Sequence, residues 1–430
     1  MKIMTYLSMG LLLYPLLAAI AYTIGGYVYH HSYKGKIKTF YHFKPEEEPL
    51  VTIMVPAHNE EVVIEDTLNY LAHGLNYHNY EILVIDDAST DLTVSIVQRM
   101  KLRIPNLRLI QITENHGKAH AFNIGMGFAK GEYVLSNDAD TTPEPDAIWK
   151  YVNYFVGNRY QNTGAVTANM GTQNRNGLLE KSTTVEFASI MGLIKRAQQG
   201  TLGSVYAFNG ANTMYRKAAA LDVGGFRQDR ATEDISIAWD MQYNGWRAIF
   251  APEILFYMNI PDNGQDFYHQ RLRWAMGGTE SFIDNFRRIF RHPIKNINKV
   301  IMLIDQFSSI TWCLYYFLTT ITMLVDVVLF MVIGEYSSAS YTFQSFVIFL
   351  SFMVVFGLSQ LILALVLDDS GKKMKYLLFA PLYLLFFWQI NVITVVNTIF
   401  LAIKNTTNYD AKGNWKSPTR VKINKDETDN

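Results

Sequence analysis

The hydrophobic residues of this chain fall into two patterns. Long, largely uncharged runs occupy residues 3–29 near the start and three later stretches, at about 301–334, 343–367 and 376–403. A membrane-spanning helix needs about 20 apolar residues, so each run is long enough to cross a bilayer. Between about residues 45 and 290 the apolar runs are short and alternate with amphipathic ones, as in a folded domain outside the membrane.

Basic residues flank the long runs and predict their orientation. We expect residues 1–30 to form a retained transmembrane helix, because a cleaved signal peptide has a shorter apolar region. Lysine and arginine collect on the cytoplasmic side of membranes. The sequence therefore predicts a multi-pass protein of the cell membrane, with a cytoplasmic domain at 45–290, a membrane region at 301–403 and a basic tail at 404–430. Three crossings would place the tail outside, whereas its basic residues favour the cytoplasm, so the topology of the tail stays open.

The segment from 45 to 290 begins with an alternation of strands and helices. Strands are expected at 50–55, 81–85, 107–112 and 133–135, and helices at 62–73, 92–100 and 119–129. This rhythm predicts an α/β domain with a mostly parallel, Rossmann-like sheet and helices on both faces. Ligands of such sheets bind at the carboxyl ends of the strands. The polar sequences PAHNE, DDASTD and DAD all fall at such ends, which favours a binding site there.

Asp138 and Asp140 follow the fourth expected strand, in the sequence GEYVLSNDADT. In a strand the two carboxylates would lie on the same side, where both stay ionised only if a cation joins them. Oxygen ligands suit Mg²⁺ or Mn²⁺, and Mg²⁺ usually shares its shell with substrate phosphates. We therefore predict a metal site at Asp138 and Asp140 that grips a diphosphate. The alternative is an acidic turn in which Asp140 caps the following segment.

The other polar loops supply groups that a nucleotide donor needs. Asp86 or Asp87 could accept a hydrogen bond from the imide N–H of uracil, and Lys118 could bind diphosphate as a point charge at a helix start. Backbone and amide groups of the loop after the first strand offer hydrogen bonds to the ribose side. That loop contributes Pro56, Ala57, Asn59 and Glu60 to the donor set. The alternative for each residue is a helix cap or a surface charge.

A second acidic pair lies further along the chain, in the sequence RATED. Glu233 and Asp234 begin a stretch with helical spacing, so Asp234 would lie in the first turn of a helix, where the helix dipole lowers its pKa. A hydroxyl group that attacks a sugar carbon needs a base within hydrogen-bond reach. We predict that Asp234 is this base and assign Glu233 to the same catalytic pair. The alternative is a charge that stabilises the helix N-terminus.

The sequence QRLRW comes just before the basic approach to the second apolar run. Gln270, Arg273 and Trp274 would share one helical face, since residues three and four apart are neighbours. Arg273, with Arg271 in the same motif, can pair with a leaving diphosphate, and Trp274 offers a flat apolar platform with one N–H donor for a sugar ring. The alternative is an amphipathic interfacial helix with snorkelling arginines. Both descriptions are compatible, because such a helix would hold Trp274 at the membrane entrance.

Composition excludes several other classes of protein. The net charge is zero, so no bulk field attracts nucleic acid. The single cysteine, Cys313, lies in an apolar run, which leaves neither a disulfide framework nor a cysteine zinc site.

Taken in order, these motifs resemble a known family. PAHNEE, DDASTD, GKAHAFNIG, DAD, TED and QRLRW follow one another as in the processive family-2 glycosyltransferases, which include the cellulose, chitin and hyaluronan synthases. Within that group the chain is most similar to the bacterial poly-β-1,6-N-acetylglucosamine synthases, through GLIKRAQ, QRLRWAMGG and WKSPTR. Two positions depart from the pattern. Ala88 stands where relatives often have glycine, with little expected effect, and Met276 stands where close relatives usually have glutamine.

The resemblance implies a GT-A domain inserted between transmembrane helices, with an inverting transfer from UDP-N-acetylglucosamine that makes a β-linkage. By the same resemblance Asn209 and Gly210 belong to the loop under the acceptor sugar, together with Gln270, Arg271, Arg273 and Trp274 on the acceptor and diphosphate side. It further implies a growing polysaccharide that leaves across the lipid bilayer, and a small membrane accessory subunit as a partner. No nucleic-acid partner is expected.

Three other functions remain as alternatives. A hyaluronan-, chitin- or cellulose-type synthase would use another sugar with the same motifs. A single-addition transferase that makes a glycolipid would use DAD and a base without needing QRLRW. A nucleotide-sensing transporter would bind UDP without transferring sugar.

Overall fold

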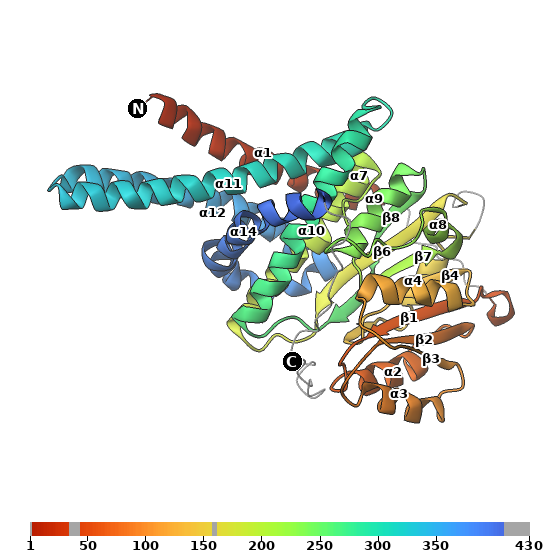
Figure 1. Cartoon of the computed structure of the whole chain (residues 1–430). Coiled ribbons are helices and arrows are strands. Elements are labelled where there is room, and N and C mark those ends of the chain that lie inside the picture. Colours follow the sequence, from red (N-terminus) through yellow and green to blue (C-terminus); the bar gives the residue numbers. More distant parts are fainter. Residues whose placement is uncertain (1, 34–43, 157–160, 408–430) are drawn as a thin grey trace.

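The computed structural model of the chain describes residues 2–33, 44–156 and 161–407 (Figure 1). The expected basic tail therefore lies almost entirely outside the described residues. The described domain that follows the N-terminal helix is built on one eight-stranded sheet with the order β3-β2-β1-β4-β7-β6-β8-β5. Its strands are β1 Val51–Ala57, β2 Tyr80–Asp87, β3 Leu107–Ile112, β4 Tyr133–Ser136, β5 Thr141–Pro143, β6 Thr163–Thr172, β7 Thr213–Arg216 and β8 Arg247–Met258.

Helices cover both faces of this sheet, as the alternating pattern predicts. Alternate residues of β1 point to opposite faces, so Val51, Ile53 and Val55 join one buried cluster with α2, α3 and α5, whereas Met54 joins a second cluster with α4, α8 and α9. The helices of this part are α2 Ile64–His73, α3 Thr93–Lys101, α4 Lys118–Phe128, α5 Ala147–Val152, α6 Leu178–Phe187, α7 Ile194–Leu202, α8 Lys217–Asp222 and α9 Glu233–Tyr243, with the short segments η1 Pro45–Glu47 and η3 Ala188–Leu193.

The sheet combines a parallel half with an antiparallel insertion. Strands β3, β2, β1 and β4 are parallel neighbours, and all four coincide with strands expected from the sequence. Strand β7 then pairs antiparallel with both β4 and β6, while β6 and β8 are again parallel. The sheet is thus mixed and mostly parallel.

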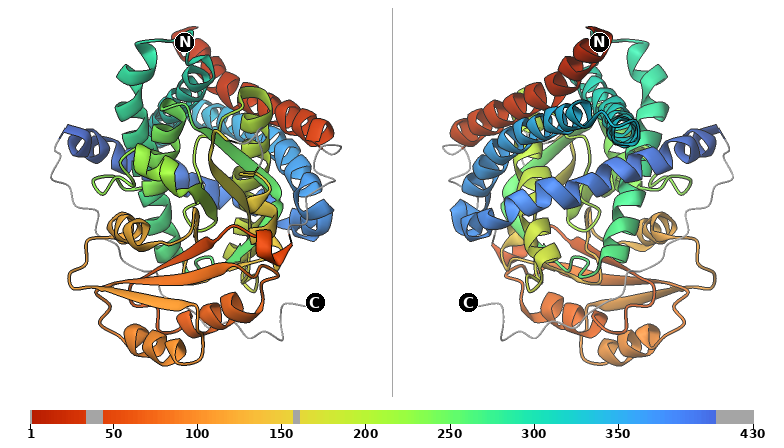
Figure 2. Two further views of the ribbon diagram at one scale, coloured as in Figure 1. Left: turned by 90° about the vertical axis from the view of Figure 1, so that its right-hand side faces the viewer. Right: turned by 90° about the vertical axis from the view of Figure 1, so that its left-hand side faces the viewer.

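The remaining helices form a separate layer, and Figure 2 shows them gathered at the end of the molecule opposite α2 and α3. Three helical segments in the described part are long and apolar enough to cross a membrane, at Ile297–Val332, Tyr336–Leu367 and Gly371–Thr406. The first two, α11 and α12, project side by side from the body (Figure 1). The elements of this layer are α1 Lys2–Tyr33, α10 Gly264–Phe290, α11 Ile297–Val332, α12 Tyr336–Leu367, η4 Asp368–Phe379, α13 Ala380–Leu382, η5 Tyr383–Phe387 and α14 Trp388–Thr407.

Within this layer, polar contacts join the N-terminal helix α1 to α11. Asp305 of α11 accepts hydrogen bonds from the hydroxyl groups of Tyr14 and Tyr22 on α1. A carboxyl group within an apolar segment is costly unless it is paired, so these two hydroxyls explain how Asp305 is accommodated. Helix α11 is thereby held against α1, whose own crossing of the membrane stays a prediction.

Candidate active site

The loops after β1, β2 and β4 meet at one edge of the sheet. Because β1 pairs parallel with β2 on one side and β4 on the other, with Ala57 opposite Asp86, the three polar loops leave the sheet together. A surface cavity of about 460 Å³ lies beside the loop after β2. It is lined by Asp86, Ala88, Ser89, Thr90, Val94, Gln111, Ile112 and Thr113.

The two aspartates at the end of β2 have different surroundings. One carboxylate oxygen of Asp86, Oδ2, accepts a hydrogen bond from the Ser89 N–H at 3.2 Å, whereas its Oδ1 is buried and makes no hydrogen bond to any described residue. Burial raises the pKa of Asp86. Both oxygens of Asp87 are occupied, by the N–H groups of Gly117 at 2.8 Å and His116 at 3.2 Å. Asp86 therefore keeps an acceptor for a ligand, and Asp87 fixes the start of α4.

The loop after β1 is tied to the loop after β2 through Asn59. Its side-chain oxygen accepts a hydrogen bond from the Thr90 N–H at 2.8 Å, and its own N–H donates to the Ser89 hydroxyl at 2.9 Å. Asn59 and Ala88 both have a φ of 57°, in the left-handed region. Asparagine tolerates this conformation, but alanine adopts it at a cost of roughly 1 kcal/mol. The two loops therefore stabilise each other in a conformation that suits glycine at position 88.

The acidic residues after β4 lie beside a lysine. The strand ends at Ser136, so Asp138 and Asp140 occupy the turn before β5 and do not alternate along a strand as expected. Lys118, the first residue of α4, places its ammonium nitrogen 2.6 Å from Asp138 Oδ1 and 3.7 Å from Glu233 Oε1. Burial alone would lower the pKa of Lys118, but these two carboxylates raise it. Lys118 is thus a charged link between the DAD and TED sequences.

The acidic turn suits a metal ion whose shell a ligand completes. Asp138 is partly exposed and Asp140 is buried. Among residues 2–33, 44–156 and 161–407, no three His, Cys, Asp or Glu side chains gather into a site able to hold a metal by themselves. Mg²⁺ is commonly held by one or two carboxylates together with substrate phosphates. Asp138 and Asp140 supply two carboxylates, which fits a metal ion whose other ligands come from substrate phosphates.

Asp234 lies in the first turn of α9, as the sequence predicts. Its Oδ2 accepts a hydrogen bond from the Gly210 N–H at 3.0 Å. Burial, followed by the charge of Glu233, raises its pKa to about 6, against the opposing charges of Arg273, Lys118 and Lys195. The expectation that the helix dipole lowers this pKa is therefore wrong. The dipole effect is typically below about 1 kcal/mol, which is less than the combined effect of burial and a neighbouring carboxylate.

Gly210 lies where these groups converge. A Cβ atom at this position would stand 3.2 Å from Glu233 Oε1, 3.3 Å from Asp234 Oδ2 and 3.5 Å from the Lys118 ammonium nitrogen. The preceding residue, Asn209, is buried, and its side-chain oxygen accepts a hydrogen bond from Lys195. The loop that carries Asn209 and Gly210 therefore contacts the carboxylate pair directly.

Helix α10 presents the QRLRW residues in two different ways. Arg271 is buried, pairs with Glu186, and lies 4.2 Å from the centre of the Trp274 ring. Its guanidinium also donates a hydrogen bond to the side-chain oxygen of Gln270 at 3.1 Å. Arg273 is exposed, and its charge acts on Asp234. Arg271 thus packs against the Trp274 ring, while Arg273 lies within electrostatic range of Asp234.

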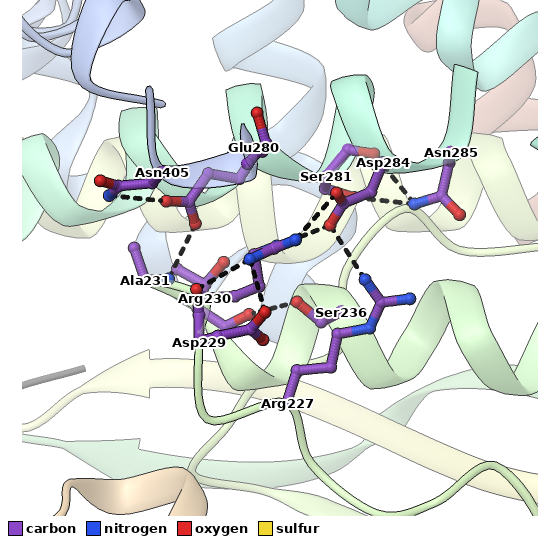
Figure 3. A network of polar contacts seen from close by, with 12 residues as sticks. Arg227, Asp229, Arg230, Ala231, Ser236, Glu280, Ser281, Asp284, Asn285 and Asn405 are labelled. Carbon is purple, nitrogen blue, oxygen red and sulfur yellow. Dashed lines mark hydrogen bonds and ion pairs between the residues drawn. The ribbon is translucent and has the colours of Figure 1, made fainter. Parts of the chain in front are cut away.

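A buried ion-pair network locks the start of α9 against α10, as Figure 3 shows. Arg230, with 4% of its side chain exposed, donates to both oxygens of Asp284 on α10, at 2.7 Å and 3.0 Å. Arg227 donates to the same carboxylate at 2.9 Å. Two arginines that flank one carboxylate hold the loop before the TED sequence in a fixed position relative to α10.

The same network reaches the last membrane helix through Glu280. One oxygen of this buried carboxylate accepts a hydrogen bond from the Ala231 N–H at 2.8 Å, and the other accepts from Asn405 of α14 at 3.2 Å (Figure 3). Burial raises the pKa of Glu280. Close by, Gly277 leaves no room for a side chain, because a Cβ would meet the Thr232 hydroxyl at 2.0 Å. Helix α10 therefore packs directly on Ala231 and Thr232, in the turn before α9.

Comparison with known proteins identifies the family. The chain matches glycosyl transferase family 2 over residues 52–224 and cellulose synthase over residues 216–413. It is 30% identical to the poly-β-1,6-N-acetyl-D-glucosamine synthase of Staphylococcus epidermidis over 96% of this chain and 98% of that protein. The chain belongs to the poly-β-1,6-N-acetylglucosamine synthase family of family-2 glycosyltransferases. It is also 33% identical to the Staphylococcus aureus (strain COL) synthase, over 70% of this chain and 72% of that protein.

A solved structure supports the same fold. The mannosyltransferase PcManGT from Pyrobaculum calidifontis, in complex with GDP-Man and Mn²⁺, aligns with a TM-score of 0.52 and 23% identity, over 86% of this chain and 98% of that chain. The synthase is therefore a GT-A-like family-2 glycosyltransferase, as its motifs predict, and it is a processive polysaccharide synthase with candidate membrane helices after its catalytic domain.

The structure of the synthase also contains site residues that the sequence did not reveal. Lys195 and Glu186 both contact predicted site residues from the segment before Asn209, and Arg230 and Glu280 hold the turn before α9 against α10. The GLIKRAQ sequence marks Lys195 by resemblance alone. Nothing in the local pattern of the other three predicts their partners, which lie far away in the sequence.

Proposed function

We propose that this polysaccharide synthase polymerises N-acetylglucosamine from UDP-N-acetylglucosamine into a β-1,6-linked chain, with inversion at the donor carbon, and passes the product across the membrane. The observation that carries the proposal is the cluster of Gly210, Glu233, Asp234, Lys118 and Asp138 at the carboxyl edge of the sheet. The names of the staphylococcal relatives support the sugar and the linkage.

On the donor side, Asp86 is the residue that recognises uracil. Its unpaired Oδ1 can accept the imide N–H, and the adjacent cavity has room for the base. Asp138 and Asp140 would hold Mg²⁺ or Mn²⁺, which supplies positive charge to the diphosphate when bound. Lys118, at the N-terminus of α4, adds a second cation to the same phosphates. Pro56 and Ala57 at the end of β1, with Asn59 and Glu60 in the loop that follows, lie on the ribose side.

On the acceptor side, Asp234 removes the proton from the attacking hydroxyl. A base with a pKa of about 6 is mostly ionised at neutral pH and more basic than an ordinary aspartate, which suits proton abstraction. Arg273 stabilises the charge that develops on the leaving diphosphate. Trp274, held by Arg271, stacks on the acceptor sugar, with Gln270, Asn209 and Gly210 around it.

The membrane setting follows from the same layout. Helix α10 carries the acceptor residues and lies along α14, so the acceptor site adjoins the membrane layer. We propose that the catalytic domain is cytoplasmic, that α1 is a further span at the cell membrane, and that a small accessory subunit binds the membrane helices. The balanced net charge gives no support for a nucleic-acid partner.

Transfer assays with purified membranes test the proposal. Membranes would receive UDP-N-acetylglucosamine, UDP-glucose or UDP-glucuronate separately, and the products would be sized on gels and digested with linkage-specific hydrolases. We expect long polymer from UDP-N-acetylglucosamine alone, sensitive to a β-1,6-specific hydrolase. The Asp234→Asn variant should bind UDP normally and make no polymer. Polymer from another sugar would indicate a hyaluronan-, chitin- or cellulose-type synthase, a single-sugar product a glycolipid transferase, and UDP binding without transfer a sensor.

A further inference from the structure

A buried lysine lies on the acceptor side of the site without a role in the reaction described above. Lys195 belongs to α7 and is 5% exposed. The helix continues directly from η3, a π-helical segment at Ala188–Leu193, and such segments occur frequently at functional sites. An ammonium group is costly to bury unless its partners stabilise it. Burial lowers the pKa of Lys195 to about 7, while the charge of Asp234 opposes this shift.

A short chain of hydrogen bonds connects Lys195 to the catalytic base. Its ammonium donates to the side-chain oxygen of Asn209. The Asn209 amide in turn donates to the Ala168 carbonyl at 2.8 Å, and the Asn209 N–H donates to the Thr167 hydroxyl at 3.0 Å. The next residue, Gly210, donates its N–H to Asp234 Oδ2. The side chain and the backbone N–H of Asn209 are thereby both held in place next to the residue that contacts Asp234.

We propose that Lys195 is a positioning residue for the transfer reaction, which orients the Asp234 carboxylate through Asn209 and Gly210 and contributes a positive charge beside it. The proposal rests on the proposed function, in which Asp234 is the base. Arg196, the next residue on α7, faces Asp368 at 4.0 Å instead. The other charged groups around Asp234 are Glu233 on its own helix, Lys118 on α4 and Arg273 on α10. In the part of the chain that the structure describes, none of these three neighbours forms a hydrogen bond or ion pair with Asn209.

The test compares Lys195→Met, Asn209→Ala and the double variant in the full-length protein in membranes. We expect Lys195→Met to lower kcat by about 10- to 100-fold, the usual effect of a misplaced catalytic group, with UDP affinity and the KM for the donor within about threefold. The acid limb of the pH profile should move to higher pH by at least about half a unit, because a cation that favours ionised Asp234 is lost. The double variant should be no slower than the slower single variant, since both substitutions break the same connection between Lys195 and Asn209.

Matched variants separate this role from a purely structural one. Lys217→Met removes a lysine away from the site, which donates to the Ala129 carbonyl at 2.7 Å, and should leave kcat and the pH profile unchanged. Lys195→Arg keeps the charge and should keep the acid limb at its wild-type position. An unshifted acid limb in Lys195→Met, or additive losses in the double variant, would overturn the proposal.

Two further outcomes are decided by other variants. If the Lys195→Met variant no longer binds UDP, the Asn209→Ala variant tests the proposal instead. A normal kcat in Asn209→Ala overturns the proposal, and a tenfold or greater loss of kcat with intact UDP binding supports it. Full activity of Asp234→Asn would instead refute the proposed base, whatever Lys195 does.

Discussion

Replacing Glu233 with glutamine should move the pH dependence of synthesis to lower pH. Glu233 is the largest contributor after burial to the raised pKa of Asp234, so removing its charge should make Asp234 easier to ionise. The size of the effect follows from Gly210. The oxygens Glu233 Oε1 and Asp234 Oδ2 lie 3.2 Å and 3.3 Å from the same point beside that glycine, which limits their separation to about 6.5 Å. Coulomb's law at this separation gives about 0.6 kcal/mol in water and about 2.5 kcal/mol at an effective dielectric constant near 20.

These energies correspond to a downward shift of between about half a pH unit and two units. The assay is kcat/KM for UDP-N-acetylglucosamine in purified membranes from pH 4.5 to 8, because this ratio reports the free enzyme. With a pKa of about 6, about a tenth of Asp234 is ionised at pH 5. The variant should therefore retain about 3- to 10-fold more of its own plateau activity there.

Glu132→Gln is a suitable control for this experiment. Glu132 is an exposed carboxylate that pairs with Arg216 at 2.9 Å, away from the site, so its replacement should leave the profile unchanged. The plateau activity of Glu233→Gln can fall for another reason, since Glu233 also pairs with Lys118. The position of the acid limb is thus the decisive readout. An acid limb that stays in place or moves upward would refute the electrostatic explanation for the basicity of Asp234.

Three other substitutions test separate parts of the structure. Asp86→Asn should weaken UDP binding by about 10- to 100-fold in calorimetry, because a hydrogen bond to a charged group contributes about 1.5–3 kcal/mol, whereas equal affinity would exclude Asp86 from uracil recognition. Ala88→Gly should leave activity intact and change the free energy of unfolding by less than about 1 kcal/mol, whereas Ala88→Val should destabilise the loop by more than that, because φ is 57° there. Arg230→Met should lower the free energy of unfolding by about 2–3 kcal/mol, less than a full buried-pair loss because Asp284 keeps Arg227. Its melting temperature in detergent should fall by roughly 4–12 °C, and an unchanged value would show that the pair does not stabilise the turn.

The parallel half of the fold could be predicted because its information is local. Each of β1, β2 and β3 is a short apolar run followed by an amphipathic helix, and the parallel arrangement follows from that alternation. The strands β5 to β8 were not predicted. Strand β6 pairs with β8, about eighty residues later, and β7 pairs with β4, about eighty residues earlier. Pairing of that range is decided by tertiary packing, which leaves little trace in a short window of sequence.

In the candidate site too, the sequence predicted the residues, whereas long-range packing decided their surroundings. The DAD and TED sequences predicted Asp138, Glu233 and Asp234 as site residues, and the structure brings them around Lys118 and Gly210. The electrostatic environment was not predictable. A residue in the first turn of a helix is expected to have a lowered pKa, but burial by distant segments reverses this effect. That burial becomes visible only when the loop at Gly210 and helix α10 are in place.

The raised pKa of Asp234 also explains why several polar contacts hold the turn before α9. A carboxyl group whose pKa is higher in the folded than in the unfolded protein destabilises the folded state progressively as pH rises from the unfolded to the folded value, and fully above the folded value. For Asp234, with a pKa of about 6, the cost is largely absent near pH 4 and fully present at neutral pH. It amounts to about 1–3 kcal/mol for a shift of this size at a partly exposed site. Arg230 with Asp284, and Glu280 with the Ala231 N–H, stabilise the same turn from its far side and offset that cost. Contacts that never touch the substrate thus allow the synthase to keep a basic carboxylate beside its donor site.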